Sequence, residues 1–271
     1  MENKFTCNML QIPVELIRYC HQQKLVKPFA VFVYLKFHSS GKIQKGSPVF
    51  AQLMNDLEIK DNRTLQAHIG KLRELNWIGY NPDSEYYFIR SLNKIVKNLN
   101  LSSKIVAPIN ESHLKNFRAF MTASVITADV NRNKFYHEIA VPRKLKAATQ
   151  KKHVANQSLD SKKGFNKPDY YGISNKRIAN LLGCSQTRAT ELKKESEMAG
   201  LIETRHHFKR IAVLKNSDAY LRPQLQSLNM QFGNRIRFRK CNENGSECVE
   251  VLEQLTDEIK GKIKLKTRRR K

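Results

Sequence analysis

The chain is poor in acidic side chains, and it has no long apolar run. Only 24 Asp and Glu residues stand against 49 Lys and Arg residues among 271, which leaves a formal net charge of +25. A surface that basic attracts polyanions, so nucleic acid is the partner that the composition favours. The apolar stretch 29–37 is too short to span a bilayer. Because the first residues also lack the basic-then-apolar layout of a secretion signal, we expect a cytoplasmic protein with no membrane partner.

Residues with catalytic or metal-binding chemistry are also scarce. The five cysteines are scattered, which is typical of reduced thiols in a cytosol. Cys241 and Cys248 could face each other across a hairpin, but they lack the close spacing and the second pair of ligands of a zinc site. Adjacent His206 and His207 would point to opposite faces of a strand, and no glycine-rich phosphate loop is present. We therefore predict no metal, no cofactor and no enzymatic activity.

The stretch 174–214 has the pattern of a helix-turn-helix followed by a β-hairpin wing. Gly183 can take the left-handed conformation that ends the first helix, and Ser185 can cap the second helix. Strands at 201–205 and 208–214 would form the wing. Apolar or small residues occupy the positions that such a unit buries: Ile178, Ala179, Leu182, Cys184, Ala189 and Leu192.

The helix predicted at 186–199 carries amide, hydroxyl and guanidinium groups, which can pair with base edges in the major groove of DNA. The predicted base-reading residues are Gln186, Thr187, Arg188 and Thr190. The predicted contacts to the DNA backbone, from this helix and the wing, are Ser185, Lys194, Arg205, His206, Lys209 and Arg210. Winged helices also serve as protein-pairing modules, and that interpretation stays open.

The first half of the chain repeats this order of elements. An offset of 124 residues places Leu65 on Ala189 and Ile78 on Ile202. Ser47 and Asp61 can cap its helix pair, and a hairpin is predicted at 77–90. The exposed face of its second helix would offer Asn62, Arg63, Thr64, Gln66 and Lys71. Whether this copy reads DNA or pairs with another subunit is left open.

We predict an α+β fold, mainly α with small β-hairpin wings, organised as two tandem winged helix-turn-helix domains. The first would span 1–90, a linker 91–111, the second 112–215 with a basic insert at 141–171, and a C-terminal extension 216–271. Within these regions we expect helices at 142–156 and 217–231, a hairpin of 236–241 with 246–252, and a disordered tail at 260–271. The basic residues that would follow the phosphate backbone are Lys144, Lys151, Lys152, Lys162, Lys163, Arg268, Arg269 and Arg270.

Two winged helices in tandem, in a strongly basic chain of this length without catalytic motifs, resemble the replication initiators of plasmids and some phages. The resemblance covers roughly 13–214, and the insert 141–171, the C-terminal hairpin and the tail depart from it. It implies that the C-terminal winged helix reads repeated origin sequences, while the N-terminal one pairs subunits, as in a homodimer, or adds a second DNA contact.

Three hypotheses follow. The first is a sequence-specific double-stranded DNA-binding protein of a mobile element or phage, acting as a replication initiator or a transcriptional regulator. The second is an architectural or RNA-binding component of a larger nucleoprotein complex, without base readout. The third is a DNA-strand-processing enzyme.

Overall fold

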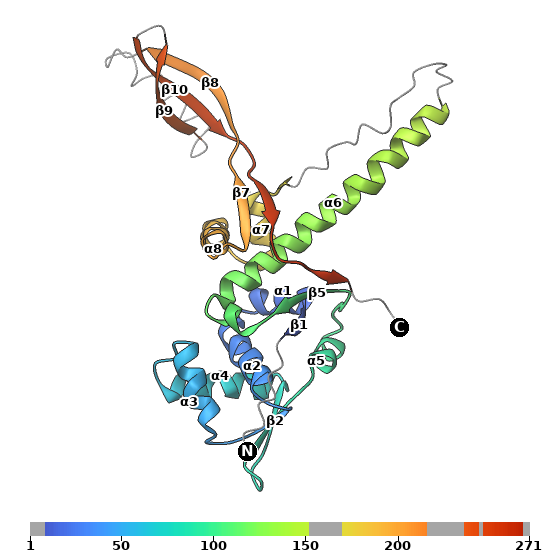
Figure 1. Ribbon diagram of the computed structural model, residues 1–271, viewed down its shortest axis with the longest axis vertical. Helices are drawn as coiled ribbons and strands as arrows, with labels where there is room; N and C mark the ends of the chain where they lie inside the picture. Colours follow the sequence, from blue (N-terminus) through green and yellow to red (C-terminus); the bar gives the residue numbers. More distant parts are fainter. Residues whose placement is uncertain (1–8, 152–169, 216–235, 244–245, 268–271) are drawn as a thin grey trace. The chain divides into compact units, whose positions relative to one another are not determined.

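The computed structural model describes residues 9–151, 170–215, 236–243 and 246–267 (Figure 1). The chain divides into two compact units, one from 1–163, 175–203 and 261–271, and the other from 164–174 and 204–260. Helices are combined with three-stranded antiparallel sheets, so the predicted α+β class is confirmed.

The core of the first half is built around one apolar helix. Its elements are β1 (Leu10–Pro13), α1 (Val14–Gln22), α2 (Val26–Phe37), β2 (Lys42–Gln44), α3 (Pro48–Asp56), α4 (Asn62–Glu74), β3 (Ile78–Asn81) and β4 (Tyr86–Ile89). Helix α2 packs against α1, α3, α4 and β4, which explains why it is apolar on nearly every side. Trp77 lies edge-on to Phe29 and Phe32, with ring centroids 5.8 and 5.7 Å away.

The second half has the same order of elements. They are η1 (Glu111–Leu114), α6 (Phe117–Lys151), β6 (Tyr171–Gly172), α7 (Asn175–Leu182), α8 (Gln186–Met198), β7 (Ile202–Arg205) and, much later, β11 (Glu258–Gly261). In the first half the sheet order is β2-β4-β3, and in the second it is β6-β11-β7. In both sheets, therefore, the last strand lies between the strand that precedes the helix pair and the strand that follows it.

The first and last residues of these elements agree with the predicted repeat. The offset of 124 residues superimposes α4 on α8 and β3 on β7 residue for residue. It also matches the capping residues Asp61 and Ser185, each of which accepts a backbone N–H of its helix. Asn76 and Gly200, one residue past the C-caps, both have the left-handed φ, at 59° and 69°. The two halves thus share local backbone conformation at positions where their side chains differ.

The prediction that 201–205 and 208–214 pair as a hairpin is wrong. Strand β7 lies beside β11, whereas β8 (Phe208–Lys215) pairs with β10 (Ser246–Gln254). The two residues between β7 and β8 are His206 and His207, and neither is of the Gly or Asn type that a two-residue hairpin turn requires. The stretch 206–257 is therefore inserted between two strands that are paired in the sheet.

The hairpin predicted from 236–241 and 246–252 is confirmed. Strand β9 (Ile236–Glu243) pairs with β10, and with β8 these strands form the twisted three-stranded ribbon in Figure 1. The register places Cys241 opposite Cys248, as the sequence predicts, and it places Arg239 opposite Glu250.

Two segments that we predicted to be a linker and a disordered tail contribute strands. The segment 91–111 contains α5 (Leu92–Asn98) and β5 (Ile105–Ile109), and β5 pairs with both β1 and β12 (Lys266–Thr267). The prediction of a disordered tail is therefore wrong for residues 260–267. Its lysines alternate with apolar residues, and the buried Ile259 anchors β11. The helix predicted at 142–156 is part of α6 as far as Lys151, and the one at 217–231 lies outside the described residues.

Candidate nucleic-acid interface

The turn between α7 and α8 is built as the sequence predicts. Gly183 has a φ of 66°, which L side chains rarely adopt, and this conformation ends α7. Ser185 Oγ accepts the backbone N–H of Arg188 at 3.2 Å and so caps α8. Ile178, Ala179, Leu182, Ala189 and Leu192 are all buried, while Cys184 is only partly so.

One face of α8 is left open by this packing. The buried residues of the helix are Ala189, Leu192, Lys193 and Ser196. With 3.6 residues per turn, the side opposite them carries Thr187, Glu191, Lys194 and Met198, all of which are exposed. Predicted readers Gln186 and Thr190 lie on one border of this row, and Thr190 Oγ1 donates to the carbonyl of Gln186 at 2.9 Å.

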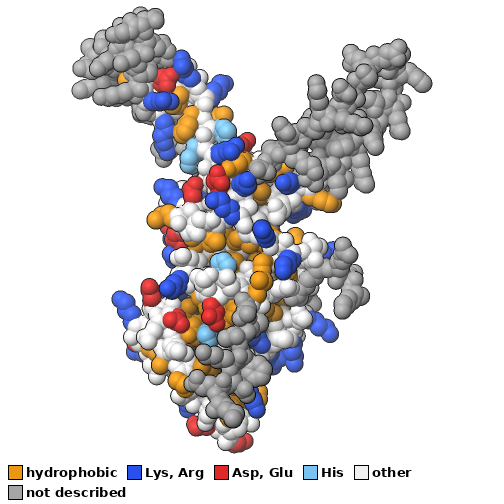
Figure 2. Space-filling model, viewed as in Figure 1, with side chains coloured by type: hydrophobic (Ala, Val, Ile, Leu, Met, Phe, Trp, Pro, Cys, Tyr) orange, Lys and Arg blue, Asp and Glu red, His pale blue; other side chains and the backbone are white. Residues whose placement is uncertain are grey.

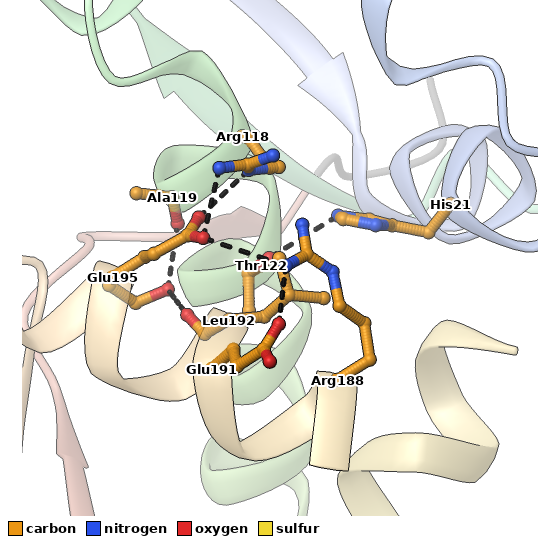
Figure 3. A network of polar contacts seen from close by, with 9 residues as sticks. His21, Arg118, Ala119, Thr122, Arg188, Glu191, Leu192 and Glu195 are labelled. Carbon is orange, nitrogen blue, oxygen red and sulfur yellow. Dashed lines mark hydrogen bonds and ion pairs between the residues drawn. The ribbon is translucent and has the colours of Figure 1, made fainter. Parts of the chain in front are cut away.

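A polar network holds α8 against α6 (Figure 3). The guanidinium of Arg118 donates two hydrogen bonds, of 2.8 and 2.9 Å, to the carboxylate of Glu195. Ser196 Oγ is buried beside them and lies 3.1 Å from the carbonyl of Ala119. A bidentate pair and a buried hydroxyl contact fix the rotation of α8, and hence which side chains its open face presents.

Arg188 belongs to the border of α8 that carries this network. Its Nη1 donates to Glu191 at 2.6 Å and lies 3.9 Å from a carboxylate oxygen of Glu195. The side chain of Arg188 is 40% exposed, so it is reachable, but two carboxylates already compete for its charge. Base reading by Arg188 therefore requires these ion pairs to open.

Glu191 is not among the base-reading residues that the sequence predicts. It lies on the open face of α8 beside Thr187 and Lys194, and its side chain is 54% exposed. A carboxylate at this position can accept a hydrogen bond from the amino group of cytosine. The sequence does indicate that Glu191 lies beside a predicted base-reading residue. It follows Arg188 by three positions, and side chains at that spacing are neighbours on a helix.

His21 ties the first half to this network. Its Nε2 lies 3.5 Å from Thr122 Oγ1 on α6, and the imidazole is 8% exposed. Burial, together with the nearby charges of Arg118 and Arg188, lowers the pKa of His21 to about 4. The next residue, Gln22, donates to the carbonyl of Leu181 at 3.4 Å. Helix α1 therefore braces the α7–α8 turn from the first half of the chain.

The corresponding open face of α4 is more basic. Its outward row is Arg63, Ala67, Gly70 and Glu74, and the predicted contacts Asn62, Gln66 and Lys71 border it. Thr64 makes its hydrogen bonds within the start of α4, because its N–H and hydroxyl both donate to the capping Asp61, at 2.7 and 2.8 Å. Helix α4 has three basic residues and one acidic residue, whereas α8 has three of each.

Most of the predicted wing contacts have partners within their own unit. The guanidinium of Arg205 lies 3.6 Å from the ring centroid of Tyr170. His206 Nδ1 is 2.8 Å from Asp257, and His207 Nε2 is 3.0 Å from Glu258. In the ribbon, Arg210 pairs with Glu250 at 2.8 Å, and Lys209 is exposed. The acidic partners come from residues 250–258, which local sequence reasoning does not connect to the strand at 208.

The predicted backbone contacts of the basic insert and tail fall partly on α6. Lys144 and Lys151 belong to the C-terminal part of α6. Lys152, Lys162, Lys163, Arg268, Arg269 and Arg270 lie outside the described residues. On the face shown in Figure 2, Lys and Arg side chains are spread over the described surface, with Asp and Glu among them. Charge alone therefore does not single out one element as the interface.

Metal-binding clusters and membrane-spanning helices are both absent from the part of the chain that the structure describes. Within it, no three His, Cys, Asp or Glu side chains are grouped so that they could hold a metal ion. None of its helices combines the length and the apolar character needed to cross a bilayer.

In comparisons with protein-family models, with curated proteins and with solved structures, no match to the chain was found. What the open faces of α8 and α4 can bind therefore follows from their own side chains. Each face is exposed, is held by a capped and packed helix, and carries groups that can donate to or accept from base edges and phosphates.

Proposed function

We propose that the chain is a sequence-specific double-stranded DNA-binding protein built from two tandem winged helices. One observation carries the proposal. The helix pair α7–α8, with its three-residue turn at Gly183, presents an exposed polar row on the second helix, and the strand order of the adjoining sheet is that of the first half. This is the arrangement in which a recognition helix enters the major groove.

In this proposal, Thr187, Glu191 and Lys194 face the bases, and Gln186 and Thr190 reach the edge of the same groove. Ser185 and the N-terminal turn of α8 face the phosphate backbone, where backbone N–H groups favour an anion. Because α8 has as many acidic as basic residues, basic residues elsewhere in the chain provide most of the non-specific attraction to DNA. Helix α8 then contributes discrimination more than affinity.

Helix α4 provides the second contact. Arg63, Gln66 and Lys71 border or occupy its open face, and its net charge is positive. Two base-reading helices in one chain fit a two-part or repeated DNA site, as used by a replication initiator or a transcriptional regulator of a mobile element or phage. A cytoplasmic location and association with further subunits belong to the same proposal.

The balanced charge of α8 also favours a second candidate function. A helix with as many acids as bases can pack on a protein, in which case the chain would be an architectural or RNA-binding component of a nucleoprotein complex. The two functions differ in whether any base pair is preferred.

The test is selection of bound duplexes from a random pool at about 150 mM salt, a concentration that weakens non-specific contacts. We expect a motif from the native chain. Replacement of Glu191 by Gln should change the preferred base pair at one position from cytosine toward adenine, since an amide pairs with adenine, at a cost of about 1–3 kcal/mol for the original site.

Glu111→Gln is the matched control, because the Glu111 side chain has the same 54% exposure and loses the same charge. It should leave the motif unchanged. Recovery of no motif, with affinity that falls steeply with salt for every duplex, would contradict base reading and support the architectural function.

A further inference from the structure

The outer face of the sheet in the first half carries two aromatic side chains that the core does not use. Along β4, Tyr87 and Ile89 point inward and are 5% exposed, whereas Phe88 is 45% exposed and Tyr86 is half-buried. Residues two apart on a strand share a face, so Tyr86 and Phe88 lie side by side on the outside of the central strand.

The neighbouring strands frame this pair with polar and small residues. Phe88 lies between Lys42 on β2 and Gly79 on β3, and Tyr86 lies between Gln44 and Asn81. The ammonium of Lys42 is 5.7 Å from the ring centroid of Tyr86. Because Gly79 has no side chain, the Phe88 ring is not covered from that side.

The repeat shows that the fold does not require aromatic residues here. Strand β11 has the same place in the second sheet, and its buried Ile259 corresponds to Tyr87. The residues on either side of it, Glu258 and Lys260, correspond to Tyr86 and Phe88. Charged side chains therefore suffice at these two positions for packing, so packing alone does not explain the aromatic pair of the first copy.

We propose that this aromatic face binds unpaired bases of single-stranded DNA. Two rings side by side on a sheet offer surfaces on which successive bases stack, and such stacking tolerates any base sequence. Lys42 supplies a cation for the phosphate backbone. Gln44 and Asn81 place amides where base edges would lie, and Asn81 is oriented by accepting the N–H of Asp83 at 2.9 Å.

The assignment to DNA, and not to RNA, rests on the proposed function. An open hollow connects the outward side of α4 with β3, and it is lined by Gly70, Arg73, Glu74, Asn76, Ile78, Gly79 and Tyr80. Arg73 lies over the ring of Tyr80, 5.3 Å from its centroid, along this path. In this proposal, a strand that separates from a duplex held by α4 passes along the hollow to Gly79, which lies opposite Phe88.

The test uses the full chain and a twelve-residue oligothymidine carrying one 2-aminopurine, whose fluorescence falls when it stacks. We expect Phe88→Leu to weaken single-strand binding by about 5- to 150-fold and to abolish the quenching. Phe135→Leu, which removes an exposed ring from α6, is the matched control and should change neither. Duplex affinity should stay within about twofold in both variants, which separates this proposal from major-groove reading by α8.

A second variant keeps the test independent of folding. Lys42→Gln leaves the apolar sheet intact and should reduce the salt dependence of single-strand binding by about 0.7 in the log–log slope. Equal losses from Phe88→Leu and Phe135→Leu, or native affinity in Phe88→Leu, would overturn the aromatic face as a base-binding site. Equal binding of the corresponding oligouridine would overturn the assignment to DNA.

Discussion

Lowering the pH should destabilise the chain through a single buried histidine. His21 is buried beside Thr122, and burial is the largest cause of its low pKa, followed by the charges of Arg118 and Arg188. The folded protein therefore keeps the imidazole neutral under conditions in which the unfolded chain takes up a proton. We predict that His21→Gln, which retains a hydrogen-bonding group toward Thr122, removes this pH dependence.

The magnitude follows from the two pKa values. The pKa of His21 is about 4 in the folded protein and 6.5 in the unfolded chain. Since the folded pKa is the lower one, the contribution to stability is fully present above pH 6.5 and is lost as the pH falls toward 4. At about 1.4 kcal/mol per pKa unit, the loss is about 2 kcal/mol by pH 5 and about 3 kcal/mol by pH 4.

The measurement is the free energy of unfolding in urea, for the native chain and for His21→Gln, at several pH values between 7.5 and 4.5. Titration of all other groups is common to both proteins, so the difference between them isolates His21. It should shrink by about 2 kcal/mol on going from pH 7 to pH 5. A difference that stays constant over this range would show that burial does not hold His21 neutral.

Two glycines allow further tests by thermal or urea unfolding. Gly183→Ala and Gly200→Ala both place a Cβ at positive φ, which costs about 1–2 kcal/mol. Only at Gly183 would the Cβ also lie 3.0–3.1 Å from Gln22, so Gly183→Ala should be the more destabilising, and equal losses would show that α1 does not brace the turn. Gly261→Ala should cost about 1–3 kcal/mol because its Cβ would overlap the buried side chain of Thr127, and native stability would contradict that packing.

The features that the sequence predicts well are those set by neighbouring residues. Asp61 and Ser185 are capping types followed by helical patterns, and Gly183 is the residue that a left-handed turn favours. The offset of 124 residues was visible because matched positions are buried in both halves. A comparison of residue identities does not find every matched position, since Asn76 takes the same conformation as Gly200 without being glycine.

The features that the sequence could not predict depend on residues far apart in the chain. Strand β7 pairs with a strand some fifty residues later, and neither strand contains a signal for that partner. Similarly, Arg118 and Glu195 meet only because α6 and α8 pack together. The helical pattern places the predicted base-reading residue Arg188 on an exposed face. Its ion pairs with Glu191 and Glu195 depend on the rotation of α8 that this packing imposes.

The differences between the two copies point to a division of labour within the proposed function. The first copy has a basic helix, α4, and an aromatic sheet face at Tyr86 and Phe88. The second copy has a charge-balanced helix, α8, and replaces the short turn of the first sheet with the ribbon β8–β10. The two copies share their caps and strand order but differ in the surfaces that our proposal assigns to ligands. In our proposal, α8 discriminates between duplex sequences, whereas the first copy adds affinity and holds unpaired bases.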